Sequence, residues 1–272
     1  MQCRSLGFAT DLAILELGGS SVERRSGYWR ICSPHAPTYY WGNFLLVDAL
    51  DGEITAEAWK RCFGEELPAA RHFALGVDDP QAEKGDATGF AELGDDVDMM
   101  TVLTCSPSDL VGSGERHGDV RPLVEDRDWD QALHLGVATR GDEFAEASYR
   151  TFFSNYLAMQ RAIVSAGRGA WWGAFSDGCL VSQCGIIDCG SGLARYQMVS
   201  THPGFRRQGF ASKVVASAGT FAATDLGAEK LVIVADPTYH AISIYRALGF
   251  AETEQMLTIE KMVEIDGRHS EF

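Results

Sequence analysis

The chain has 272 residues, of which 46% are hydrophobic and 22% charged, so it is long enough for two globular domains. Its formal net charge of −15 argues against a nucleic-acid backbone or an anionic membrane surface as the main partner. Its apolar runs are far shorter than the roughly 20 residues that span a bilayer. Its N-terminus lacks the basic segment of a signal peptide, and we therefore expect a cytoplasmic protein.

The seven cysteines are odd in number and scattered along the chain. Three of them, Cys179, Cys184 and Cys189, fall five residues apart, but none has the spacing of a zinc ligand. We expect reduced, mostly buried thiols and no metal site.

The N-terminal half, residues 1–114, contains no catalytic motif but has a regular order of elements. An acidic loop, residues 48–53, lies between the first predicted strand and the helix, and Asp78-Asp79-Pro80 follows the second strand. Phe90 and Gly94 precede the third strand. The predicted strands cover residues 40–47, 72–77 and 97–104, and the predicted helix covers residues 56–67.

The C-terminal half begins with a strand, two helices and a hairpin. The strand covers residues 119–123, and the helices cover residues 126–139 and 143–166. Residues 170–175 and 179–188 are predicted to pair across a turn at Asp177-Gly178.

The strongest local pattern is a strand over residues 196–201, a break at His202-Pro203-Gly204, and a helix over residues 210–226. The first turn of a helix carries unpaired N–H groups and a partial positive charge. Gly209 is small enough to let a phosphate approach this turn, and Arg206 adds positive charge. The segment therefore predicts an anion site.

A buried strand over residues 231–235 follows, and Asp236-Pro237-Thr238 is predicted to start a short helix. That helix places Ala241, Ile244, Tyr245 and Leu248 on one face and ends at Gly249-Phe250. A final strand is predicted over residues 254–263.

These two segments resemble the motifs of the GNAT acetyltransferase family. The acyl-CoA motif of that family, V-x-x-P-x-x-R-x-x-G-x-G/A, is matched in register by Pro203, Arg206, Gly209 and Ala211, with Val199 displaced by one place. Its second signature, A-x-x-x-Y-x-x-x-G-F, is matched by Ala241, Tyr245, Gly249 and Phe250. The resemblance covers residues 119–264 and implies an α/β (α+β) GNAT fold, in which helices flank a central, twisted mixed sheet.

The resemblance implies that the chain uses acetyl-CoA as its acyl donor. The backbone of Val199 to Thr201 would pair with the pantetheine arm, a main-chain N–H near Val199 would polarise the thioester carbonyl, and the loop before the helix would hold the pyrophosphate. The implied donor-binding residues are Val199, Ser200, Thr201, Arg206, Arg207, Gln208, Gly209, Phe210, Ala211, Ser212 and Thr238. Thr238 stands where many members have Asn.

Tyr245 matches the usual general acid of the family, which protonates the departing thiolate. The resemblance does not identify the base, because Gln197 stands where many members have Glu, and an amide is not a useful proton acceptor. A bound water, Asp188, His202 or His240 remains a candidate.

The N-terminal half repeats the order of the C-terminal elements around residues 231–249. Its phosphate loop, residues 48–53, is acidic and without arginine, and Phe90 replaces the tyrosine. We therefore predict a tandem pair: a degenerate GNAT-like domain over residues 1–114 and a catalytic domain over residues 115–272.

Two hypotheses follow for function. In the first, the protein is an N-acetyltransferase that acts on a primary amine of a small molecule or peptide, as a monomer or homodimer. In the second, it is an acyl-CoA sensor or scaffold without turnover. Intact Tyr245 favours the first, and Gln197 favours the second.

Overall fold

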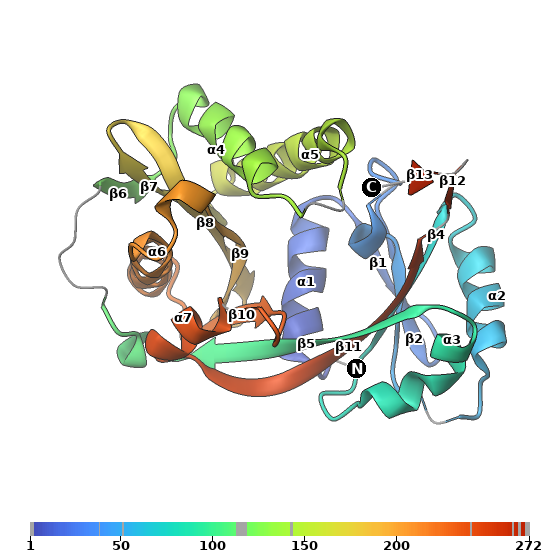
Figure 1. Ribbon diagram of the computed structural model, residues 1–272. Helices are drawn as coiled ribbons and strands as arrows, with labels where there is room; N and C mark the ends of the chain where they lie inside the picture. The colour runs from blue at the N-terminus through green and yellow to red at the C-terminus, as the bar shows by residue number, and fades with distance from the viewer. Residues whose placement is uncertain are drawn as a thin grey trace. The chain divides into compact units, whose positions relative to one another are not determined.

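The computed structural model describes residues 3–37, 39–50, 52–112, 119–141, 144–239, 241–262, 264–265 and 268–269. The chain divides into two compact units, one formed by residues 1–102 and 253–272 and the other by residues 103–252. The division falls inside two long strands, β5 (Asp96–Cys105) and β11 (Ala251–Met262) (Figure 1). Among the described residues, no helix is long and apolar enough to cross a membrane.

The N-terminal unit is a mixed sheet with helices, and its strands lie in the order β1-β2-β3-β4-β11-β5. Strands β3 and β4 are parallel, whereas β11 runs antiparallel to β4, with Leu257 opposite Val77 and Met262 opposite His72. The other elements of this unit are α1 (Leu6–Leu17), β1 (Ser21–Arg24), β2 (Tyr28–Cys32), β3 (Phe44–Val47), α2 (Ala56–Glu66), β4 (His72–Val77), α3 (Thr88–Glu92), β12 (Glu264–Ile265) and β13 (Arg268–His269).

The C-terminal unit has the strand order β10-β9-β8-β7-β6, in which only the β9–β10 pair is parallel. The turn between β7 and β8 has left-handed residues at Asp177 and Gly178, as the predicted hairpin requires. Its elements are β6 (Asp119–Pro122), α4 (Asp126–Ala138), α5 (Glu146–Ser165), β7 (Gly169–Ser176), β8 (Cys179–Gly190), β9 (Leu193–Thr201), α6 (Phe210–Asp225), β10 (Lys230–Ala235) and α7 (Ile242–Ala247).

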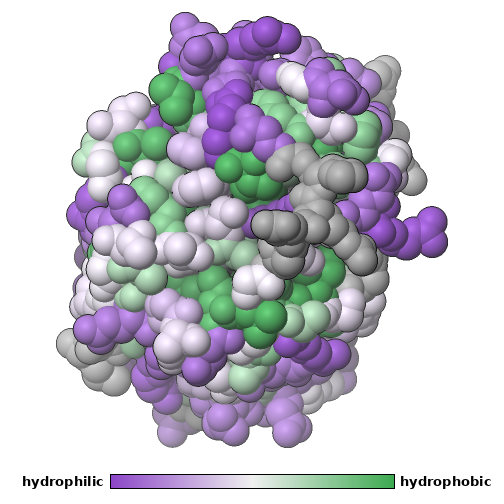
Figure 2. Space-filling view, turned by 90° about the vertical axis from the view of Figure 1, so that its left-hand side faces the viewer, coloured by the Kyte–Doolittle hydropathy of each residue, from purple (hydrophilic) through white to green (hydrophobic). Residues whose placement is uncertain are grey.

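Each unit has a hydrophobic core of its own. In the C-terminal unit, α6 packs on the sheet, and the Tyr196 hydroxyl of β9 donates a hydrogen bond of 2.8 Å to the Val215 carbonyl. In the N-terminal unit, α2 packs Trp59 and Phe63 onto strands β3 and β4. Figure 2 turns the left-hand side of Figure 1 toward the viewer and shows a mostly hydrophilic face with apolar residues gathered near its centre.

One predicted strand needs correction. Residues 40–47 are not one strand, because Tyr40–Gly42 forms a 3₁₀ turn before β3. The division into domains over residues 1–114 and 115–272 stays a prediction, and the compact units place residues 103–112 in the C-terminal unit and most of β11, which pairs with β4, in the N-terminal unit. The predicted boundary itself, at residues 114 and 115, lies outside the described residues.

The sequence analysis also omitted three elements, α1, β1 and β2. Helix α1 buries Phe8, Leu12, Ile14 and Leu15 and so lacks the single apolar stripe that marks a surface helix. Its boundaries did carry a signal, because the Ser5 side chain caps its N-terminus and Gly18 ends it.

Candidate functional site

A cavity of about 420 Å³ lies in the C-terminal unit, at the end of β9. Its walls come from β9, from the loop and first turn of α6, and from α7 with the loop before it. The lining residues are Thr139, Val199, Ser200, Thr201, Phe205, Arg206, Arg207, Gly209, Phe210, Ala211, Ser212, Tyr239, Ala241, Ser243, Ile244 and Tyr245.

The first wall is the free edge of β9. Its parallel pairing with β10 ends where Arg195 lies opposite Val232, although β9 continues to Thr201. On its other edge, the His202 N–H donates to the Val181 carbonyl of β8 at 2.9 Å. Because backbone groups alternate along a strand, those of Val199 and Thr201 are directed away from β8. Past Arg195, this edge of β9 has no strand partner among the described residues, and its Thr201 carbonyl accepts a hydrogen bond from the Arg206 Nε atom at 3.3 Å.

A β-bulge shapes this edge. Gln183 lies opposite Ser200 and Gly185 opposite Gln197, so two residues of β9 face one residue of β8. One of the two, Met198, has a φ of 49°, which a bulky side chain seldom adopts. The bulge therefore includes Val199, the position near which the resemblance implies an N–H for the thioester carbonyl.

The second wall is the start of α6. Gly209 is the N-cap residue with a φ of 83°, and within the described part of the chain no side chain caps this helix end. A Cβ added at Gly209 would meet no atom within 4 Å. Arg206 and Arg207 are exposed beside this turn. This wall is suitable for an anion, because it combines open N–H groups, the positive end of the helix dipole and two guanidinium groups.

The third wall contains Tyr245, which is 5% exposed and packs edge-on to Phe250 with ring centroids 6.3 Å apart. Burial raises the pKa of the Tyr245 hydroxyl well above its usual value, and Cys184 and Tyr239 nearby raise the pKa further. The phenol thus keeps its proton across the physiological pH range.

Two predicted residues do not line the cavity. The Gln208 side chain donates to the Gly204 carbonyl at 3.3 Å and is exposed. Thr238 bonds to Asp236, whose Oδ1 accepts both the N–H and the hydroxyl of Thr238 at 2.7 Å. These residues form a turn rather than a helix cap, and α7 begins later, with Ala241 as its N-cap residue.

Sequence reasoning named the lining residues Ala241 and Ile244 only as parts of a helix face, and it missed four others: Thr139, Phe205, Tyr239 and Ser243. Phe205, Tyr239 and Ser243 lie within or next to the recognised motifs, so their positions in the chain gave a signal. Thr139 gave none, because it lies at the end of α4 and reaches the cavity only through tertiary packing.

The candidate bases lie outside the described lining. Asp188 forms an ion pair with Arg168 at 3.1 Å, and the ring of His202 accepts the Gly204 N–H at 3.2 Å. The Gln197 Oε1 atom accepts a 2.8 Å hydrogen bond from the Tyr156 hydroxyl, and His240 lies outside the described residues.

An acyl-CoA molecule fits the donors and acceptors of this cavity. The pantetheine amides need strand-like partners, which the free edge of β9 offers, and the pyrophosphate needs an open helix start with cations. The buried Ser200 hydroxyl, which lines the cavity, has no hydrogen-bond partner among the described residues. A polar ligand would give it one.

Residues 129–250 match the sequence model of the acetyltransferase (GNAT) family. That segment, which contains most of the cavity's walls, therefore belongs to the GNAT family. A search of curated protein sequences finds no match.

Solved structures extend the similarity of fold to nearly the whole chain. A conserved protein of unknown function from Staphylococcus epidermidis has a TM-score of 0.69 at 16% identity, over 88% of this chain and 92% of that one. A GCN5-related N-acetyltransferase from Kribbella flavida has a TM-score of 0.65 at 15% identity, over 96% and 98%. A tandem GNAT protein from the clavulanic acid pathway has a TM-score of 0.55 at 14% identity, over 80% and 74%. The predicted mixed α/β GNAT fold is thus confirmed.

In the N-terminal unit, the parallel strands β3 and β4 do not separate before β3 ends, unlike β9 and β10. The parallel pairing of β3 with β4 continues to the last residue of β3, where Val47 lies opposite Val77, and the Asp78 N–H then donates to the Val47 carbonyl at 2.7 Å. Helix α2 is capped by Thr55 and carries Glu57 in its first turn, both unfavourable for a bound anion.

Proposed function

We propose that this protein is an acyl-CoA-dependent N-acyltransferase that moves an acetyl group from acetyl-CoA to a primary amine. The observation that carries the proposal is the cavity, which combines a free strand edge, an uncapped helix start with two arginines, and a buried tyrosine. Each of these features has a counterpart in the chemistry of an acyl-CoA.

In this proposal, the donor supplies a thioester carbonyl, and the attack of a neutral amine nitrogen breaks its C–S bond. The Val199 backbone N–H would stabilise the negative charge that develops on the carbonyl oxygen. Arg206 and the first turn of α6 would fix the pyrophosphate. These contacts hold the donor in place, so that transfer proceeds directly without an acyl-enzyme intermediate.

Tyr245 would donate its proton to the departing thiolate. An ordinary thiol has a pKa of about 8.5 and an ordinary tyrosine one of about 10. Burial in the cavity wall raises the Tyr245 pKa, so the phenol is protonated when the C–S bond breaks. Since Gln197 is an amide bonded to Tyr156, we assign the proton of the amine to a bound water rather than to that position.

The proposal is tested by calorimetric titration of the protein with acetyl-CoA. Arg206→Ala should weaken binding about 10- to 100-fold, the range for one charge-assisted hydrogen bond. Arg127→Ala is the matched control, because Arg127 is an exposed arginine of α4 outside this cavity, and its variant should bind like the wild type. Absence of binding by the wild type would contradict the proposal.

Catalysis is tested separately by the release of free CoA thiol in the presence of a panel of amines. An amine-dependent release that Tyr245→Phe slows about 100-fold or more, with donor binding intact, would establish the acyltransferase. Tight binding of acetyl-CoA without turnover on any amine would instead favour the second candidate, a non-catalytic acyl-CoA-binding module, for which the amide at Gln197 is the supporting observation.

We further propose that the N-terminal unit is a degenerate GNAT copy without a donor site. Its closed β3–β4 pair and its capped helix α2 support this view, as does Asp48, whose carboxylate is bonded to Arg24 at 2.6 and 2.8 Å. The titration should then give one acetyl-CoA per chain, and a stoichiometry of two would contradict it. The protein would act in the cytoplasm on a small-molecule or peptide amine.

A further inference from the structure

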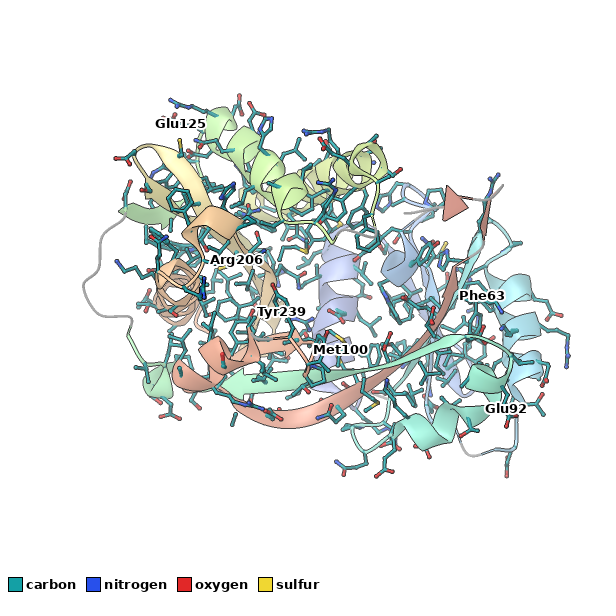
Figure 3. The ribbon with its side chains drawn as sticks, in the orientation of Figure 1. Phe63, Glu92, Met100, Glu125, Arg206 and Tyr239 are labelled. Carbon is teal, nitrogen blue, oxygen red and sulfur yellow. The ribbon has the colours of Figure 1, made fainter. Side chains whose placement is uncertain are left out.

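An aromatic ring stands exposed at the rim of the donor cavity. Tyr239 lines the cavity and yet is 48% exposed, which makes it one of four large apolar side chains left in contact with solvent among the described residues. Tyr245, on the same cavity, is 5% exposed. The two exposures place Tyr239 at the mouth and Tyr245 at the inner end. Figure 3 labels Tyr239 together with Arg206, which lines the same cavity.

The backbone around Tyr239 is held in a turn. The Tyr239 N–H donates to the Asp236 carbonyl at 3.1 Å, and the Ile242 N–H donates to the Tyr239 carbonyl at 3.2 Å. The Asp236 carboxylate accepts two hydrogen bonds from Thr238, and these bonds lower the pKa of that carboxyl. The ring is therefore carried by a built turn that links β10 to α7.

The order of the cavity walls matches the order of groups along an acyl-CoA. The thioester belongs at the inner end, beside Tyr245, and the pyrophosphate belongs at the first turn of α6. The nucleotide follows the pyrophosphate, so its base is the part of the donor nearest the mouth. A purine ring offers a flat apolar face, and such faces stack favourably on an exposed aromatic side chain.

We propose that Tyr239 stacks on the adenine ring of the acyl donor and so selects nucleotide-bearing donors over simpler pantetheine thioesters. This inference rests on the proposed function, because it assumes that the cavity holds an acyl-CoA. It adds a donor-selecting residue that the sequence motifs do not contain.

The test compares two donors, acetyl-CoA and S-acetyl-phosphopantetheine, which has the same reactive arm but no nucleotide. Tyr239→Ala should raise the Kd for acetyl-CoA about 10-fold or more, since loss of one stacked base costs at least that factor. The same variant should bind S-acetyl-phosphopantetheine like the wild type. Tyr239→Phe should bind both donors normally, and Tyr239→Leu, which is apolar but not aromatic, should behave like Tyr239→Ala.

Several outcomes would overturn the inference. Equal losses for the two donors would mean that Tyr239 contacts the pantetheine arm or only shapes the loop. Normal binding of acetyl-CoA by Tyr239→Ala or Tyr239→Leu would exclude stacking, while leaving the proposed function intact. Failure of the wild type to bind acetyl-CoA would overturn both proposals. Thermal unfolding of each variant is measured alongside, and an unchanged Tm is expected because the Tyr239 side chain is exposed.

Discussion

Replacing Gly209 by alanine can distinguish an effect on ligand binding from an effect on stability. The matched control is at the other end of α6, where a second glycine, Gly227, also has a left-handed backbone. Gly209 precedes the helix with a φ of +83°, and Gly227 follows it with a φ of +67°. At both positions, an added Cβ would meet no atom within 4 Å. The two alanine variants therefore carry a similar backbone penalty, and only one of them alters the cavity.

The penalty follows from the left-handed backbone. An alanine in this region costs about 1–2 kcal/mol, which for a unit of this size lowers Tm by about 2–8 °C. We expect both Gly209→Ala and Gly227→Ala to show this decrease. Only Gly209→Ala adds a methyl group to the cavity wall, next to the open N–H groups of α6, and its Kd for acetyl-CoA should rise at least 10-fold, about 1.4 kcal/mol.

The assay is a titration with acetyl-CoA at one temperature well below the Tm of both variants, together with thermal unfolding. Saturating ligand gives a second measurement, because a concentration of 100 times Kd stabilises a protein by about 2.7 kcal/mol. Gly209→Ala should lose much of this stabilisation and Gly227→Ala should keep it. Equal affinities in the two variants would refute the assignment of the α6 start to the pyrophosphate.

Three further predictions concern single side chains. Tyr245→Phe should lower kcat about 100- to 10,000-fold with an unchanged Kd for acetyl-CoA. Because burial raises the pKa of Tyr245, ionisation of this residue should not lower the wild-type rate up to about pH 10. A decrease in rate below that pH that is absent from Tyr245→Phe would contradict this expectation. The hydrogen bonds from Arg121 lower the pKa of the buried Asp128 carboxyl to about 2, so Asp128→Asn should lower the free energy of unfolding, measured with urea at pH 7, by about 1–2 kcal/mol. A carboxyl with a lowered pKa stabilises the folded state at pH values above its pKa in the unfolded chain, about 3.9. The difference in free energy of unfolding between wild type and variant should therefore shrink as the pH falls from 4 toward 2. The buried Asp78 carboxylate accepts hydrogen bonds from the N–H groups of Arg4 and Ser5. Asp78→Ala should therefore lower the free energy of unfolding of the N-terminal unit by about 1–3 kcal/mol, with a normal affinity for acetyl-CoA. A loss of affinity would contradict the expectation that this substitution leaves the cavity unchanged.

The two motifs of the C-terminal half could be predicted because each depends on residues that are close together in the chain. A helix start with Gly209 and no capping side chain leaves its first N–H groups open, and this depends only on residues next to one another in the chain. The spacing from Ala241 to Tyr245 puts both on one face of a helix, and both line the cavity. Most of the lining could therefore be named before the fold was seen.

Other features depend on partners that are distant in the chain. Thr139 reaches the cavity only because α4 packs beside β8. No residue pattern predicts that β9 leaves β10 after Arg195 or that β9 carries a bulge opposite β8. The turn at Asp236 was mistaken for a helix cap because an aspartate bonded to the N–H two residues later is common to both structures.

The amino-acid pattern predicted most of the local elements, the uncapped start of α6 and the place of Tyr245 on α7, because each of these depends on residues within a few turns of one another. Three features became known only from the folded chain: β11 pairs with β4, β3 stays paired to its end whereas β9 does not, and Tyr239 stands at the cavity mouth. Strand pairing joins residues far apart in the chain, and several pairing registers fit the same alternation of apolar and polar residues. Side-chain packing in the folded chain selects one of these registers.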